Sequence, residues 1–210
     1  ARPAGEPRVR VFNPQLQRDG WESPHTIVEV VTEDMPFLVD SLAGVLSDSR
    51  LPIQLRIHPV LRIARDRRGK LLSMEDQDGA LGTMESWQHV AVPRIGDPAR
   101  HEALSQNILR MLEDVRLAVS DWPAMRKRAL EIARDVNAGV PAIPRREEKE
   151  AVEFIEWLAD NHFTFLGYRE YKLERTRSVD RLVPVPRSGL GLLRTGKGRP
   201  QPKPTVLTGE

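Results

Sequence analysis

The chain has 210 residues, and its 32 basic and 30 acidic side chains leave a formal net charge of only +2. So balanced a charge does not by itself indicate a nucleic-acid-binding protein. No apolar run approaches the roughly 20 residues that a membrane-spanning helix needs, and no secretory signal opens the chain. Cysteine is absent, which excludes disulfides and cysteine-ligated metals, so we expect a globular cytoplasmic protein.

The first 24 residues are rich in proline, glycine and arginine, and they are predicted to form a leader. Within this leader, Val9, Val11 and Phe12 can form a short edge strand. Most residues from Thr26 to Val31 are apolar and β-branched, which predicts a strand buried on at least one face.

Residues 34–38 are predicted to turn this strand into a helix. Pro36 has a fixed φ and no N–H, so it suits the first helical turn, with Asp34 or Met35 at the cap. Apolar residues then recur at helical spacing and give the helix one apolar face. These residues are Phe37, Leu38, Leu42, Val45 and Leu46.

Apolar and polar residues alternate from Ile53 to Ala64, which is typical of a strand with one wet face. We expect the face toward the helices to carry Ile53, Leu55, Ile57, Pro59, Leu61 and Ile63. The opposite face then carries Gln54, Arg56, His58, Val60 and Arg62. Such a partly apolar, arginine-studded face suits contact with another domain or subunit, so Arg56, His58 and Val60 are candidate interface residues. A fully solvated sheet face is the alternative.

A tight turn at residues 66–70, with Gly69 at a positive φ, separates this strand from the next one. Ser86–Ile95 alternates and is rich in valine, and it is predicted to pair antiparallel with Ile53–Ala64. His58 and His89 would then lie on neighbouring strands, close enough to form a pair. Solvent-facing or hydrogen-bonded histidines are the alternative.

A second helix is predicted to begin at Asp97 and Pro98, and Val115–Val119 alternates again, which predicts a last strand. The resulting order is strand, helix, strand, strand, helix, strand. This is the ferredoxin-like βαββαβ plan, an α+β fold in which two helices cover one face of a four-stranded antiparallel sheet. The domain is expected to occupy residues 25–121.

Residues 122–161 are predicted to form a helical connector. One helix is expected from Pro123 to residues 137–139, and a second from Glu147 to Asn161. Phe163–Leu173 and Asp180–Leu193 are predicted strands. Residues 162–210 are therefore expected to hold the opening strands of a second, truncated α+β domain.

Two segments come close to ligand-binding motifs without completing them. His101 and Glu102 begin like a zinc-binding HExxH helix, but Ser105 stands where the second histidine is required. Residues 191–198 come close to a phosphate-binding loop, but Gly198 replaces the Ser or Thr that meets magnesium. We therefore expect no catalytic, cofactor-binding or metal-binding residues in this chain.

The strand, the Asp-x-Pro-x-Leu turn and the helix after it resemble the first half of ACT regulatory domains. In that family the turn lines an amino-acid site at a dimer interface. The resemblance makes Asp34, Met35, Pro36, Phe37 and Leu38 the candidate ligand turn. Phe37 stands where the family has glycine, and we expect its ring to pack into the core or the neighbouring helix. No amino-acid pocket would then remain at this turn.

Several motifs in order along residues 25–193 resemble the N-terminal region of the large bacterial NAD-dependent glutamate dehydrogenases. They are EDMPFLVDS at 33–41, HPV at 58–60, Arg65-Asp66 with Gly69, FTFLGYREY at 163–171 and GLG at 189–191. The resemblance implies a series of ACT-like domains here and a dehydrogenase domain, with its NAD and glutamate sites, far downstream. The whole enzyme would deaminate L-glutamate oxidatively to 2-oxoglutarate as a homo-oligomer. The chain itself would then be a non-catalytic regulatory or assembly fragment, whose partners are the rest of the enzyme and its other subunits.

Two functions of other classes also fit the predicted fold. A free-standing ACT-type sensor would bind a free amino acid as its effector. An RNA-binding ferredoxin-like module would bind RNA in a salt-dependent way, but the predicted sheet lacks stacking aromatic residues. We expect neither nucleic acid nor a membrane as a partner.

Overall fold

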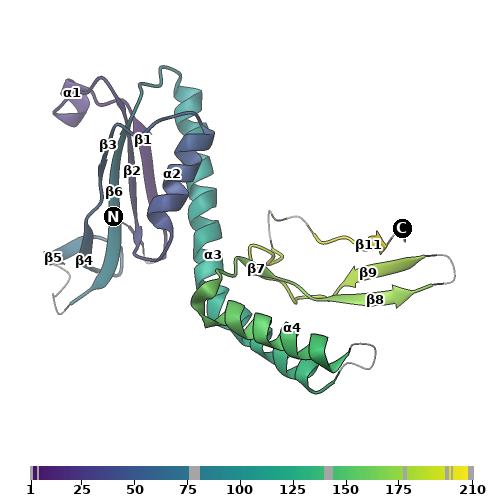
Figure 1. The fold of residues 1–210 in the computed structure, drawn as a ribbon. Coiled ribbons are helices and arrows are strands. Elements are labelled where there is room, and N and C mark those ends of the chain that lie inside the picture. Colours follow the sequence, from purple (N-terminus) through teal and green to yellow (C-terminus); the bar gives the residue numbers. More distant parts are fainter. Residues whose placement is uncertain are drawn as a thin grey trace. The chain divides into compact units, whose positions relative to one another are not determined.

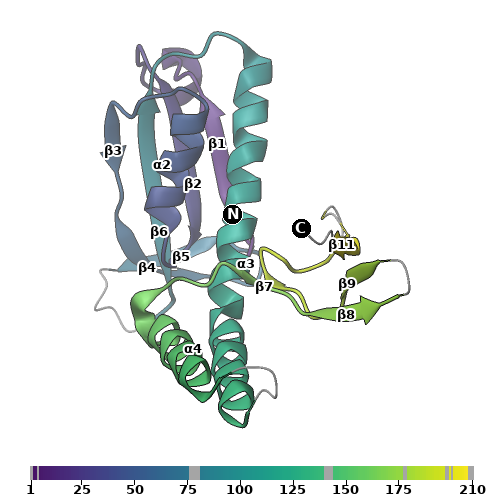
Figure 2. The same ribbon diagram turned by 45° about the vertical axis from the view of Figure 1, so that its right-hand side comes forward.

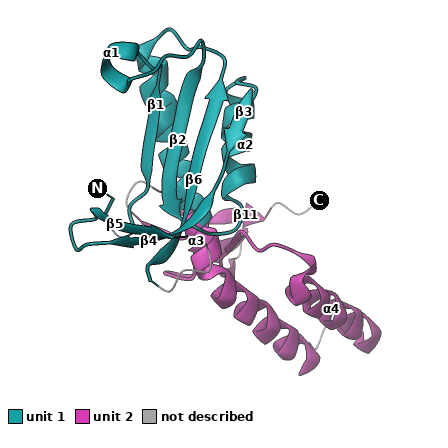
Figure 3. Cartoon of the chain, turned by 90° about the vertical axis from the view of Figure 1, so that its left-hand side faces the viewer, with its two compact units in different colours: residues 1–115 teal, residues 116–210 magenta. Residues whose placement is uncertain are grey.

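The computed structural model describes residues 2–3, 5–75, 81–139, 144–176, 179–196, 199 and 201–207. The chain divides into two compact units, residues 1–115 and residues 116–210 (Figure 3). No helix in the described part of the chain is long and apolar enough to cross a membrane.

The described residues of unit 1 form an antiparallel sheet of six strands (Figure 1). Its strand order is β1-β2-β6-β4-β5, and β3 also pairs with β6. The strands are β1 (Arg8–Phe12), β2 (Thr26–Glu33), β3 (Leu55–Ile57), β4 (Val60–Arg65), β5 (Leu71–Glu75) and β6 (Thr83–Val92). The helices are the short α1 (Leu16–Asp19), α2 (Leu38–Asp48) and the first part of α3 (Pro98–Asn137).

The core of unit 1 lies between the sheet and the two longer helices. On β2 and β6, alternate residues are fully buried, among them Val28, Val30, Val90 and Val92. Figures 1 and 2 show α2 and the start of α3 on the same side of the sheet, and Leu42 and Ile108 of these helices are fully buried too. The other face of the sheet is turned to the viewer in Figure 3, with α2 behind it, and neither α2 nor the described start of α3 covers this face.

The predicted last strand at Val115–Val119 is wrong, because these residues lie inside α3. Val115 and Ala118 are both buried, and their spacing of three continues the helical stripe of Leu104, Ile108 and Leu112. Pro123 lies inside this helix and does not begin a new one, so that predicted start is wrong as well. The end predicted near residue 137 is confirmed.

The sheet position beside β2 is held by β1, not by a strand that follows the second helix. β1 runs antiparallel to β2, with Arg8 opposite Val31 and Phe12 opposite Ile27. The edge strand predicted around Val9, Val11 and Phe12 is therefore confirmed. The predicted βαββαβ chain order is not observed, since this strand comes first in the sequence.

The predicted orientation of β3 is wrong. Leu55 pairs with Ala91 and Ile57 with His89, whereas Arg56 pairs with the fully buried Val90. Because directly paired residues point to the same face of a sheet, Leu55 and Ile57 lie on the face that the helices leave uncovered. Their exposed fractions are 52% and 51%.

Unit 2 holds the rest of α3, α4 (Arg145–Trp157) and a π-helical turn at Leu158–His162. Its strands are β7 (Gly167–Tyr168), β8 (Tyr171–Arg175), β9 (Asp180–Pro184), β10 (Leu190–Gly191) and β11 (Thr205–Leu207). β7 pairs with β10, and β9 lies between β8 and β11. The helix predicted at 147–161 is confirmed up to this turn. Each predicted strand, at 163–173 and at 180–193, is observed as two short ones.

Candidate functional site

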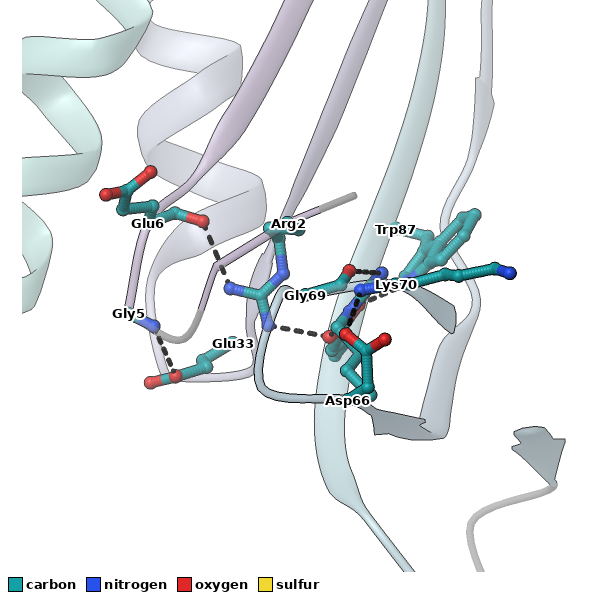
Figure 4. Close-up of polar contacts among 10 residues, drawn as sticks. Arg2, Gly5, Glu6, Glu33, Asp66, Gly69, Lys70 and Trp87 are labelled. Carbon is teal, nitrogen blue, oxygen red and sulfur yellow. Dashed lines mark hydrogen bonds and ion pairs between the residues drawn. The ribbon is translucent and has the colours of Figure 1, made fainter. Parts of the chain in front are cut away.

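A buried carboxylate, Glu85 on β6, accepts hydrogen bonds from three side chains in unit 1. Figure 4 shows the polar contacts around two of these residues, Arg2 and Trp87. Arg65 donates from Nε to Oε1 over 2.7 Å and from Nη2 to Oε2 over 2.8 Å. Arg2 donates from Nη2 to Oε1 over 2.6 Å, and the Trp87 indole N–H donates to Oε2 over 3.1 Å. The side chains of Glu85 and Arg2 are 0% and 3% exposed. Both carboxylate oxygens are therefore fully engaged away from solvent.

The same cluster fastens the N-terminal segment to the hairpin between β4 and β5. The backbone N–H of Arg2 donates to the carbonyl of Gly69 over 2.8 Å, and its guanidinium also reaches the carbonyl of Glu6. Gly69 has φ +76°, as predicted, and an added Cβ would lie 2.4 Å from the carbonyl carbon and oxygen of Arg2. Only glycine permits this contact without displacing the segment.

Electrostatics keep Glu85 ionised in spite of its burial. Burial by itself raises the pKa of this carboxyl, but hydrogen bonds from Arg65 and Arg2 outweigh it and hold the pKa below its ordinary value. A carboxylate whose oxygens are all bonded to arginine and tryptophan has no free lone pair with which to accept a proton from a substrate. The cluster therefore joins chain segments and does not form a reactive site.

The candidate ligand turn lies between β2 and α2, where the N–H of Asp34 donates to the carbonyl of Met84 over 2.9 Å. Phe37 stands at the N-cap of α2 with φ +71°, and its side chain is 46% exposed. The ring is therefore not buried in the core, the first of the two packings predicted for it. Of the five residues, Leu38 is buried, Met35 is half-buried, and Asp34 and Pro36 are exposed. The positive φ of Phe37 is one that glycine adopts without strain.

The candidate interface residues Arg56, His58 and Val60 are half-buried and belong to the helix-covered side of the sheet. A ring nitrogen of His58 lies 2.8 Å from the hydroxyl of Ser86. His89 lies on the opposite face, where its Nδ1 is 3.4 Å from a carboxylate oxygen of Glu29. His58, in the break between β3 and β4, and His89, on β6, therefore do not form a pair.

A hollow of about 270 Å³ lies on the uncovered face of the sheet, and sequence reasoning missed it. Its lining comes from β2, β6, β3 and the residues just after β3. The lining residues are Glu29, Val31, Ile57, Pro59, Trp87, Gln88 and His89. In the sequence of β2, Glu29 and Val31 alternate with buried residues, and this pattern indicates that both lie on the less buried face. It does not show which residues of other strands complete the site.

In unit 2, a second carboxylate, Asp121 on α3, closes a turn near residue 191. Arg194 donates from Nε to Oδ2 over 3.0 Å and from Nη2 to Oδ1, and the N–H of Gly191 donates to Oδ2 over 2.8 Å. Burial raises the pKa of Asp121, but the hydrogen bonds from Arg194 and Gly191 outweigh it and lower the pKa below its ordinary value.

This turn does not fit a dinucleotide phosphate. The N–H of Gly191 is already bonded to Asp121, and a Cβ on Gly189 would lie 2.1 Å from the carbonyl oxygen of Leu193. Both glycines thus serve close packing within the protein, and the described residues 189–196 include no helix whose N-terminus would hold phosphate. Lys197 and Gly198 of the loop-like motif lie outside the described residues.

The zinc-like start of α3 has another role in the structure. A ring nitrogen of His101 lies 3.1 Å from the carbonyl of Ile95, just before the helix. Across the described ranges, no group of three or more His, Asp and Glu side chains is placed to hold a metal ion.

Comparison with known proteins agrees with the resemblance seen in the sequence. The family model "Glutamate dehydrogenase, ACT1 domain" matches residues 1–108. The NAD-specific glutamate dehydrogenase of Halomonas elongata is 38% identical over 197 residues, and that of Pseudomonas aeruginosa is 36% identical over 191 residues. The matches cover 92% and 90% of this chain, but the chain spans only 12% of the length of either relative.

A third relative is similar at a lower identity. The NAD-specific glutamate dehydrogenase of Mycobacterium tuberculosis is 29% identical over 204 residues, again 12% of its length. The family model covers just over half of the chain, including the whole sheet of unit 1. The chain therefore belongs to the glutamate dehydrogenase ACT1 domain family.

Proposed function

We propose that this chain is a non-catalytic regulatory or assembly region of a large NAD-dependent glutamate dehydrogenase. The whole enzyme would convert L-glutamate to 2-oxoglutarate with NAD, at sites in a part of the protein outside these 210 residues. The observation that carries this proposal is the match of residues 1–108 to the ACT1 domain of glutamate dehydrogenases. The small share of each relative that the chain spans supports it as well.

The chemistry of the described residues supports a role without catalysis. The two buried carboxylates with lowered pKa, Glu85 and Asp121, have both oxygens engaged by arginine, tryptophan or backbone donors. Catalytic acids and bases need a proton that can be exchanged with substrate. These two groups instead fasten one chain segment to another.

A turnover assay tests this proposal directly. The purified 210-residue chain is expected to give no glutamate-dependent NADH formation and no NAD binding by calorimetry. The full-length Pseudomonas aeruginosa relative, assayed in parallel, is the positive control. Turnover by the short chain that survives repurification would contradict the proposal. Saturable binding of a free amino acid by the short chain would instead favour the free-standing sensor.

The assembly role is tested on both faces of the sheet in a longer enzyme that carries this region. We propose the accessible parts of the half-buried Arg56, His58 and Val60 as interface residues, so Arg56→Glu combined with Val60→Glu should reduce the oligomer seen by sedimentation while circular dichroism shows that the enzyme remains folded. Leu55→Glu combined with Ile57→Glu is the matched pair on the uncovered face. An effect of the second pair alone would move the interface to that face. No effect of either pair would remove both faces from the assembly.

The expected location is also part of this proposal. We place the enzyme in the cytoplasm, a location compatible with the absence of cysteine from these 210 residues. Fractionation of cells that produce the longer enzyme tests this assignment.

A further inference from the structure

We propose that the hollow on the uncovered face of the unit 1 sheet binds a small organic ammonium ion with an apolar body. This assignment goes beyond the regulatory or assembly role, because it gives the domain a ligand site away from the turn at residues 34–38. It rests on the shape of the hollow, on the fixed position of the Trp87 ring, and on the carboxylate of Glu29, whose contacts with its neighbours are long.

The hollow exists because the sheet is interrupted beside β6. β3 ends at Ile57 and β4 begins at Val60. Between them the carbonyl of Pro59 accepts a hydrogen bond from the N–H of Trp87 over 3.0 Å, and His58 turns to Ser86 on the other face. No side chain of this interruption other than Pro59 lines the uncovered face, so about 270 Å³ is left open.

Trp87 forms a wall of this hollow, and a hydrogen bond to a buried carboxylate holds its ring in place. Its indole N–H donates to Glu85, whose carboxylate is clamped by Arg65. The only polar atom of the indole is therefore occupied, and a ligand in the hollow meets the ring itself. An aromatic ring attracts cations through its quadrupole, and a ring fixed in advance loses little entropy when a ligand binds.

Glu29 supplies the charge at one end of the hollow. Its carboxylate lies 3.4 Å from Nδ1 of His89 and 3.9 Å from Nη1 of Arg10, and both distances are long for hydrogen bonds. Arg10 is also engaged with Asp19. Glu29 is half-buried, so its oxygens retain the capacity to accept an N–H from a ligand.

The remaining residues that line the hollow determine what the uncharged part of the ligand can be. Val31, Ile57 and Pro59 are apolar and suit a hydrocarbon or aromatic body. An anion would be placed against Glu29, and a wholly apolar ligand would bury that carboxylate without a partner. The volume is too small for a nucleotide or a folded peptide, so the class that fits is a small monoamine in its ammonium form.

Three probes of the same shape separate charge from apolar binding: 2-phenylethylammonium, 2-phenylethanol and 3-phenylpropionate. Each is titrated into the 210-residue chain and followed by calorimetry and by backbone amide resonances. The ammonium is expected to bind at least threefold more tightly than the alcohol, and the carboxylate more weakly than both. The amide signals of Ile57, Trp87 and His89 should shift on binding.

Variants locate the site. Glu29→Gln should weaken binding of 2-phenylethylammonium at least threefold, whereas Glu22→Gln, the same change at an exposed position outside the hollow, should leave it unchanged. Ile57→Ala should weaken binding of both the ammonium and the alcohol. This variant tests the location of the site even if Glu29→Gln does not fold. Equal affinities for the three probes would overturn the proposal. So would amide shifts confined to other parts of the chain.

Discussion

Glu85 and Arg65 form a two-pronged ion pair, with Nε–Oε1 at 2.7 Å and Nη2–Oε2 at 2.8 Å. Arg2 adds a third donor from the N-terminal segment. Three segments that are far apart in the sequence are thereby joined at one buried point. The stability of unit 1 should depend on this point more than on any exposed ion pair, since exposed pairs contribute little.

Glu85→Ala should destabilise the chain by about 3–5 kcal/mol, because it leaves the guanidinium of Arg2 buried without its partner. Urea unfolding followed by circular dichroism measures the change. Glu22→Ala is the matched exposed control and should alter the free energy of unfolding by less than about 0.5 kcal/mol. A loss below 1 kcal/mol in Glu85→Ala would mean that water replaces the carboxylate at little cost.

The contribution of Glu85 should depend on pH in a defined direction. Its folded-state pKa lies below the ordinary value of about 4.5. The stabilisation is therefore complete above that ordinary value and is lost as the pH falls through the lower, folded-state pKa. The difference in unfolding free energy between the native chain and Glu85→Gln should be constant near neutral pH and shrink below about pH 4. A difference that grows on acidification would contradict the assignment.

Gly69→Ala should destabilise unit 1 by at least about 2 kcal/mol, because it combines a left-handed backbone with a collision against Arg2. Gly20→Ala is the matched control, since Gly20 has φ +77° but open space around it. That control should cost only about 1 kcal/mol for the backbone conformation. Thermal unfolding of both variants separates the two effects. Equal losses of stability would show that the N-terminal segment moves away from the added methyl group at no cost.

Phe37→Gly should stabilise the chain by about 1 kcal/mol, because glycine adopts φ +71° without strain and nearly half of the Phe37 side chain is exposed. Phe37→Ala retains the strained backbone and loses the ring, so its melting temperature should not rise. If the glycine variant were as unstable as the alanine variant, the ring would contribute more than the strain costs.

Asp121→Ala should loosen the turn at residues 189–194, because it removes the acceptor for the Gly191 N–H and for Arg194. We expect a loss of about 1–2 kcal/mol, since Arg194 is partly exposed. Hydrogen exchange at Gly191 should become faster while Val30 in β2 keeps its protection. Unchanged exchange at Gly191 would show that neighbouring packing holds the turn without the carboxylate.

The sequence by itself determined the elements whose pattern is local. The β-branched run of β2, the alternation of β6 and the apolar stripe of α2 each have a single compatible period, so they were predicted correctly. The turn at Gly69 was also readable, because a short polar turn between two strands needs a residue with positive φ.

Other assignments depended on contacts that no local pattern carries. Val115–Val119 fits a strand or a helix, and the burial of Val115 and Ala118 on one stripe decided for the helix. The orientation of β3 followed from its register with β6, because a shift by one residue turns every side chain to the other face. Sequence alternation shows that two faces exist, and only the pairing partner decides which of them is covered.

The candidate sites divide in the same way. The family resemblance and the turn at residues 34–38 were visible in the sequence, but the positive φ and the exposure of Phe37 were not. Arg2 and Glu85 are 83 positions apart, and Glu29 meets His89 only because β2 and β6 pair in one register. Tertiary structure decided these sites, because side chains so distant in the sequence come together only when their strands pair in the folded sheet.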